Sequence, residues 1–198
     1  MRWVVFLVPL VACASVEERT LSLDVDESIV AVFPPEGRRW TYEAENEVVI
    51  AIDRLNSARE EVERRKKAVD VYEAAVDAAS QRGSAGIAVS KARLTWLESE
   101  LELAEKERDA AEEGVLCARA NFELTKAKLA VRFDLPVEEG FVEPFEEQYG
   151  SCAEALNQLN ADAERLGSKS VGQKDEWRKV RTEHVRRTGD YDHGLWID

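Results

Sequence analysis

Two long heptad repeats, separated by a glycine-rich break, constrain the fold of this chain more than any other feature of its sequence. In the first repeat an aliphatic residue recurs at every seventh position, and a companion residue follows each of them three positions later. The aliphatic residues are Val48, Leu55, Val62, Val69 and Val76, and the companions are Ala51, Ala58, Arg65, Tyr72 and Ala79. This period places one apolar stripe along a helix and predicts a coiled-coil partner, with a charged interruption at Arg65.

The second repeat follows the break at 82–86 and has the same period. Its first positions are Ile87, Leu94, Leu101, Arg108, Val115, Phe122 and Leu129, and its companions are Leu97, Ala104, Ala111 and Ala118. Two glycines in the break predict a turn, and Pro136 predicts that the second helix ends near Asp134. Because the connection is short, residues 41–134 are predicted to form a long antiparallel coiled-coil helical hairpin.

The second helix, 86–133, carries another apolar face that lies nearly opposite the heptad stripe. This face consists of Val89, Ala92, Trp96, Leu103, Ala110, Cys117, Ala120, Leu124, Ala127 and Val131. A helix that is apolar on two sides needs a cover on both. At this point three covers are open: another helix of this chain, a second copy of the chain, and a partner protein.

Residues 135–167 supply a candidate for the first of these covers, a loop followed by a third amphipathic helix. Its apolar residues are spaced alternately by four and three positions, at Phe145, Tyr149, Cys152, Leu156, Leu159, Ala163 and Leu166. This spacing is typical of one helical face. The glycine- and serine-rich composition of 167–173 then predicts a linker, so that 168–198 is expected to be a linker and a polar, basic C-terminal tail.

A β-like segment precedes the helices, within residues 13–40. Leu21, Leu23 and Val25 alternate with polar residues, which is the period of a half-buried strand. A second apolar run at 29–33 follows the pair Asp26-Glu27, where a tight turn is predicted. The expected fold is therefore mainly α: a long antiparallel coiled-coil hairpin with a third packing helix and a small N-terminal β segment.

The start of the chain has the layout of an export signal. Arg2 is followed by the apolar run 3–11, whose nine residues are too few for a membrane span, which needs about 20 residues in a helix. The tetrapeptide Leu10-Val11-Ala12-Cys13 then resembles the lipobox of bacterial lipoproteins. The resemblance implies that a signal peptide, 1–12, is removed and that Cys13 carries the lipid that anchors the protein in a membrane. In that family an aspartate after the lipidated cysteine favours the inner membrane, so Ala14 at this position implies, through the same resemblance, the outer membrane, facing the periplasm. The alternative is a buried N-terminal strand.

The other two cysteines lie on the two helical faces that are expected to pack together. If the protein is exported, it enters a compartment in which disulfides persist. We therefore predict a disulfide between Cys117 and Cys152, with two buried free thiols as the alternative.

Composition and motifs exclude several function classes. The chain has 40 acidic and 27 basic residues and a net charge of −13, so we expect no binding to nucleic acid. It contains no nucleophile elbow, zincin, Walker or dinucleotide-binding motif, so we expect no enzyme, no catalytic residue and no cofactor. His193 with Asp190 and Asp192 offers metal-ligand types, but a polar tail explains them better, and no metal site is predicted.

The hairpin also shows a recognisable spacing of glycine, alanine and leucine. The residues concerned are Tyr72, Gly83, Gly86, Ala92, Leu94, Leu101, Ala104, Ala118, Ala120 and Leu129. In this spacing residues 72–136 resemble one hairpin of the TolC family of outer-membrane efflux proteins. That family repeats the hairpin and adds long membrane strands, so the resemblance implies an accessory or reduced relative of an efflux system.

These features together predict a non-enzymatic cell-envelope lipoprotein whose hairpin serves as a structural spacer or a protein-docking surface in the periplasm. The expected partners are a membrane, through the lipid on Cys13, and an envelope protein or a second copy, through helix 86–133. The alternative is a TolC-like component of an export system that assembles through its hairpin.

Overall fold

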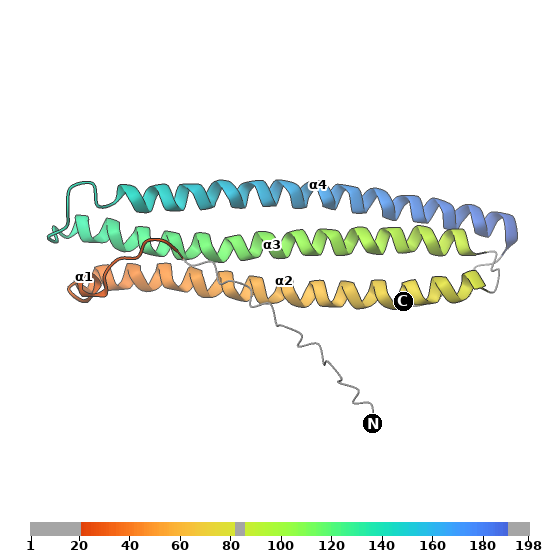
Figure 1. The fold of residues 1–198 in the computed structure, drawn as a ribbon, viewed down its shortest axis with the longest axis horizontal. Helices are drawn as coiled ribbons and strands as arrows, with labels where there is room; N and C mark the ends of the chain where they lie inside the picture. The colour runs from red at the N-terminus through yellow and green to blue at the C-terminus, as the bar shows by residue number, and fades with distance from the viewer. Residues whose placement is uncertain (1–20, 82–85, 190–198) are drawn as a thin grey trace, which may run out of the picture.

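The computed structural model describes residues 21–81 and 86–189, and the regular structure within these ranges is helical throughout. A short helix, α1 (Glu27–Ala31), precedes three long ones, α2 (Pro35–Gln81), α3 (Ile87–Arg132) and α4 (Glu143–Thr188). The long helices have 47, 46 and 46 residues. At 1.5 Å per residue each is about 70 Å long. Figure 1 shows them as a rod, with α3 in the middle and antiparallel to its two neighbours.

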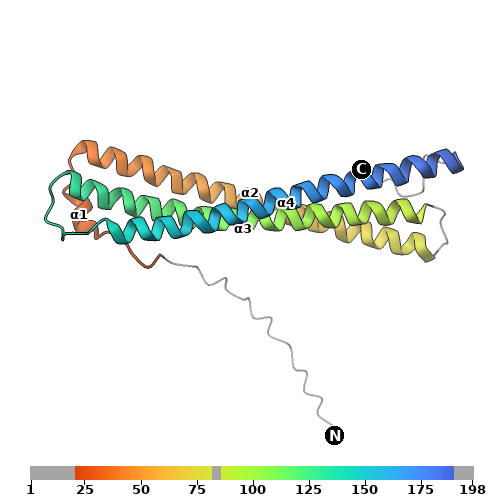
Figure 2. The ribbon, with the colours of Figure 1, turned by 90° about the horizontal axis from the view of Figure 1, so that it is seen from above.

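α3 packs against α2 along one side and against α4 along the other. Seen from above, α2 and α4 exchange sides along the rod, so the three helices wind around one another (Figure 2). The predicted seam between α2 and α3 is present, because Ala51 and Leu55 form a buried cluster with Val115. The antiparallel hairpin predicted from the heptads is therefore confirmed.

The second apolar face of α3 is covered by α4, a helix of the same chain. Leu124 is 5% exposed, and Ala120 and Ala127 are fully buried. Alanines at these positions allow the backbones of two helices to approach closely. Of the three covers that the sequence left open, the structure shows the intramolecular one.

α4 is much longer than predicted, because the linker expected after residue 167 is helical. The hydroxyl of Ser170 is buried and donates to Glu100 of α3. Lys169 pairs with Glu102 at 2.5 Å. A glycine inside a helix is destabilising by about 0.5–1 kcal/mol relative to alanine. Here contacts with α3 offset the glycines of this segment, so the linker predicted from composition was wrong.

α2 begins six residues earlier than predicted, at Pro35. Proline is tolerated in the first turn of a helix, where its missing N–H has no helical acceptor. Gly37, which was expected to help close a β segment, instead lies under the ring of Phe133. A Cβ at this position would lie 2.6 Å from the ring, so the close approach of α2 to the end of α3 requires glycine.

The β segment predicted within residues 13–40 is absent from its described part, 21–40. Residues 21–25, the strap, are irregular, with a bend at Ser22, and pair with no strand in the described ranges. Side chains take the place of one: Gln148 accepts from the backbone N–H of Leu23 at 3.2 Å, and Glu123 accepts from that of Val25 at 2.8 Å. The alternation in the sequence therefore reflects a segment buried on one side, and helices supply its hydrogen bonds.

The second predicted strand is also helical, in α1 and the residues that follow it. Asp26 does not sit in a hairpin turn but caps α1, with its carboxylate accepting from the Ser28 N–H at 2.7 Å. Hydrogen bonds from the side chain and backbone of Ser28 lower the pKa of Asp26. The apolar run that follows closes the end of the rod, where Phe33 packs with Leu129 and Ala130. The alternating and apolar residues of 21–33 thus form a cap over α3 and α4.

The strap depends on Glu123, whose side chain is 10% exposed and is also paired with Lys126 at 2.7 Å. Glu123→Ala leaves the buried Val25 N–H without an acceptor, so we expect a loss of about 1–3 kcal/mol in the free energy of unfolding. Hydrogen exchange at the Val25 amide should accelerate in the same variant. Glu123→Gln retains an acceptor oxygen and is the control. Unchanged exchange at Val25 in the alanine variant would contradict this role.

Candidate functional site

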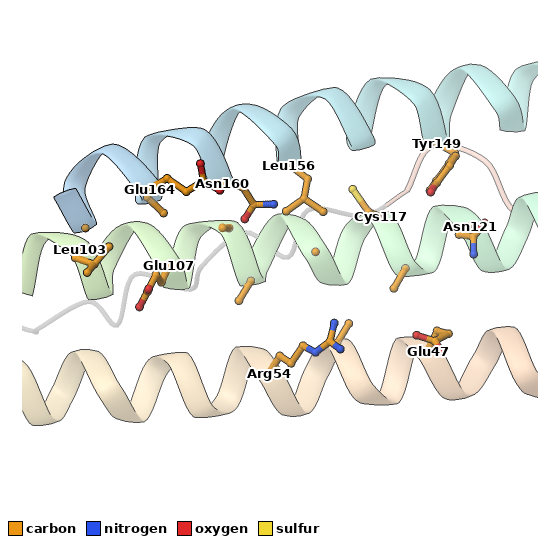
Figure 3. A pocket seen from close by; sticks show the side chains of 17 residues that line it. Glu47, Arg54, Leu103, Glu107, Cys117, Asn121, Tyr149, Leu156, Asn160 and Glu164 are labelled. Carbon is orange, nitrogen blue, oxygen red and sulfur yellow. The ribbon is translucent and has the colours of Figure 1, made fainter.

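A groove runs along the rod between α2 and α4, with α3 as its floor (Figure 3). Its volume is about 1030 Å³. The residues that line it are Glu47, Ala51, Arg54, Leu103, Glu107, Ala110, Ala111, Gly114, Cys117, Ala118, Asn121, Tyr149, Leu156, Asn160, Ala163, Glu164 and Gly167. The lining on α3 extends from Leu103 to Asn121, so the groove is about 27 Å long at the helical rise per residue.

Small residues form the floor of the groove. Gly114 lies at its centre, with Ala111 and Ala118 on the neighbouring turns of α3. A Cβ added to Gly114 would meet no atom within 4 Å. The packing of this chain therefore does not require glycine there, although glycine weakens a helix interior by about 0.5–1 kcal/mol.

Charged side chains border the groove, and each of the three helices contributes a carboxylate. These are Glu47 of α2, Glu107 of α3 and Glu164 of α4, and all three residues are exposed. None of them is in an ion pair with another residue in the described ranges. Arg54 is the one basic residue in the lining, so the groove has a negative balance.

A disulfide joins α3 to α4 beside the groove. The structure pairs Cys117 with Cys152, and their Cα atoms lie 5.4 Å apart. The geometry is that of the predicted disulfide, with the buried Cys117 at the edge of the groove floor. The carboxylate of Glu113 lies near both sulfur atoms. Sulfur atoms committed to a disulfide are not thiolate ligands, so this group is not a metal site.

A polar bridge across all three helices lies beyond one end of the groove. Arg65 of α2 contacts Glu100 of α3 at 2.9 Å, and Glu100 accepts from the hydroxyl of Ser170 of α4. Arg65 is also held by Glu61 at 2.6 Å. This explains the charged interruption in the first heptad repeat, because the arginine links helices where an aliphatic side chain would fill the seam.

The second interruption, Arg108, has its ion-pair partner within α3. Its guanidinium contacts the carboxylate of Asp109 at 2.7 Å. The hydrogen bond to Asp109 raises the pKa of Arg108. Asp109 therefore places a compensating negative charge beside the arginine within the same helix.

Aromatic and cationic side chains of all three long helices pack together between the polar bridge and the glycine-rich break. Trp96 of α3 stacks on Trp177 of α4, with ring centroids 5.2 Å apart. The guanidinium carbon of Arg93 lies 5.0 Å from the centroid of the Tyr72 ring of α2 and 5.5 Å from that of Trp177. Here side chains of α2 and α4 share one cluster, whereas along the groove the two helices are separate.

The remaining residues singled out in the sequence are distributed as follows. Cys13 and the group Asp190, Asp192 and His193 lie outside the described residues. His184, which its basic sequence surroundings predict to be solvated, is instead buried in α4 and is 4% exposed. The sequence analysis missed the groove, although Gly114, a glycine inside the predicted second helix, was a signal for it.

No family model, curated protein or solved structure matches this chain. Within the described ranges, none of the helices combines the length and the hydropathy that a membrane crossing needs.

Proposed function

We propose that the chain is a bacterial cell-envelope lipoprotein, anchored through Cys13, whose helical rod serves as a spacer and protein-docking surface in the periplasm. The observation that carries the proposal is the pairing of Cys117 with Cys152. Stable disulfides are typical of exported proteins and rare in the cytosol. The cystine therefore agrees with the export signal and lipobox at residues 1–13, and the two features are independent of each other.

The position of the strap supports a spacer role. Eight peptide steps separate Cys13 from Leu21, so the lipid would lie within about 29 Å of Leu21 at full extension. The strap packs on α3 and α4 near the end of the rod where α3 ends and α4 begins. A lipid anchor would hold this end close to the membrane. The opposite end, where α2 ends and α3 begins, would then extend about 70 Å into the periplasm.

A TolC-like role in an export system is the second candidate, because α2 and α3 form the expected antiparallel hairpin. Assembly through the second face of α3 would compete with α4, which covers that face. This favours the spacer role. A stable trimer of the purified protein in light scattering would favour the TolC-like role, and a monomer would disfavour it.

Intact-mass measurement on protein from native membranes tests the anchor. We expect a chain that starts at Cys13 and carries several acyl groups, with thiols that alkylate only after reduction. Cys13→Ser should abolish both the cleavage and the added mass, because serine offers no thiol for the lipid. A variant with both Cys117 and Cys152 replaced by alanine is the control and should keep the acyl groups. A full-length, unmodified wild-type mass would refute the proposal.

A further inference from the structure

We infer that the groove between α2 and α4 is a docking site for a basic amphipathic helix of a partner protein. The inference rests on the proposed docking role and adds the chemistry of the partner. It concerns the described helices alone, so it can be tested whether or not Cys13 carries a lipid.

The shape of the groove fits a helix. The groove is elongated along the rod, with α2 and α4 as its walls and small side chains of α3 as its floor. Its length of about 27 Å corresponds to about 18 residues of a helix. The polar bridge of Arg65, Glu100 and Ser170 joins the three helices beyond Leu103 and limits the groove on that side.

Two glycines in the lining of the groove leave room for the backbone of another helix. Gly114 in the floor and Gly167 in the α4 wall both lie inside long helices, where glycine is unfavourable. A Cβ at Gly114 would meet nothing, and one at Gly167 would only touch Leu103 at 4.0 Å. The intramolecular packing therefore explains neither glycine. A helix in the groove would explain both, because only small residues let helix backbones approach closely.

The charges of the groove select a basic helix. Glu47, Glu107 and Glu164 border it from three helices and have no ion-pair partner in the described ranges. Arg54 is the one positive charge in the lining and offsets one of the three negative charges without pairing with any of them in the described ranges. Lysines or arginines along both edges of an apolar helix would meet these groups. A second copy is the less favourable occupant, because each copy carries a net charge of −13.

The binding test uses the full chain as purified, whether or not its signal peptide has been removed. Its ligand is a fluorescent synthetic peptide of 18 residues. The peptide is helical, with an alanine and leucine face and lysines along both edges. We expect saturable binding in fluorescence anisotropy that weakens as salt is raised. A peptide with glutamate in place of lysine should not bind. Absence of binding by the lysine peptide would overturn the inference.

Matched glycine variants locate the site. Gly114→Leu fills the floor of the groove, and Gly172→Leu places the same side chain on α4 outside the groove, where a Cβ also meets nothing. We expect Gly114→Leu to weaken binding by about tenfold or more and Gly172→Leu to leave it unchanged. Equal affinities for the two variants would refute the assignment.

A charge variant and the oligomeric state complete the test. Replacing Glu47, Glu107 and Glu164 by glutamine should weaken binding and reduce its dependence on salt. If the wild-type chain instead forms a dimer that Gly114→Leu dissociates, a second copy occupies the groove and the inference is wrong. None of these results depends on the mass of the N-terminus, so failure of the groove and failure of the lipid anchor are distinguishable.

Discussion

Phe33→Ala is expected to lower the free energy of unfolding by about 3–5 kcal/mol, the range for removal of a buried aromatic side chain. Phe33 is 1% exposed and is the largest fully buried side chain in the described part of the molecule. It packs on Leu129 and Ala130 of α3, and its ring centroid lies 6.2 Å from that of Phe133. These contacts leave the resulting cavity little freedom to collapse.

Val32→Ala is the matched control, because Val32 precedes Phe33 but is 62% exposed. We expect a change within about 0.5 kcal/mol for this surface substitution. Urea unfolding measures both variants, and hydrogen exchange shows where the structure loosens. Loss of protection should concentrate at the start of α2 and the end of α3. Similar stability of the two variants would show that the cap does not hold this end together.

The long helices were predictable because their signals are local and repeat many times. The stripe that includes Leu55 and Val115 recurs over the length of each helix, so one interruption does not erase it. The pairing of Cys117 with Cys152 followed from the faces on which they lie and from the expected compartment. In both cases the sequence period corresponds directly to a packing face.

The sequence predictions were wrong where a hydrogen-bond partner that is distant in sequence determines the local structure. Ser170 belongs to a segment with a linker's composition, yet its hydroxyl is bound to Glu100, 70 residues away in sequence. Leu23 alternates as a strand residue does, yet its hydrogen bonds are to Gln148, 125 residues away. No short segment of the sequence contains both members of either pair. Local composition and period alone therefore predicted the wrong structure for these segments.

The groove was not predictable for a related reason. Its lining alternates between three helices, and no single helix carries a sequence signature of a site. Gly114 was visible as an unfavourable helix residue, whereas Gly167 was assigned to a linker, and only the structure shows that both line the same groove. The carboxylates of Glu47, Glu107 and Glu164 lie on three different helices, and only the fold brings them to one groove.

Removal of the cystine is expected to be the other large effect on stability. Replacing both Cys117 and Cys152 by alanine should lower the free energy of unfolding by about 2–4 kcal/mol, the typical contribution of a disulfide. The bond joins residues 35 positions apart, across the loop between α3 and α4. It restricts the unfolded chain over that segment, and this restriction disappears in the variant. Alanine is chosen because it adds no polar group to a buried position.

Reductant distinguishes the lost bond from the altered packing. A thiol reductant should lower the Tm of the wild type by roughly 4–16 °C. This range converts the expected loss of about 2–4 kcal/mol at about 2–4 °C per kcal/mol. It should leave the Tm of the double variant unchanged, because no bond remains to reduce. The single variant Cys117→Ala should resemble the double one, since either substitution removes the bond. A wild-type Tm that is insensitive to reductant, with thiols that alkylate freely, would show that the pair is not oxidised. That result would also remove the observation on which the envelope assignment depends. If reductant instead lowers the Tm of protein taken from cells, the α3–α4 packing is tied to an oxidising compartment.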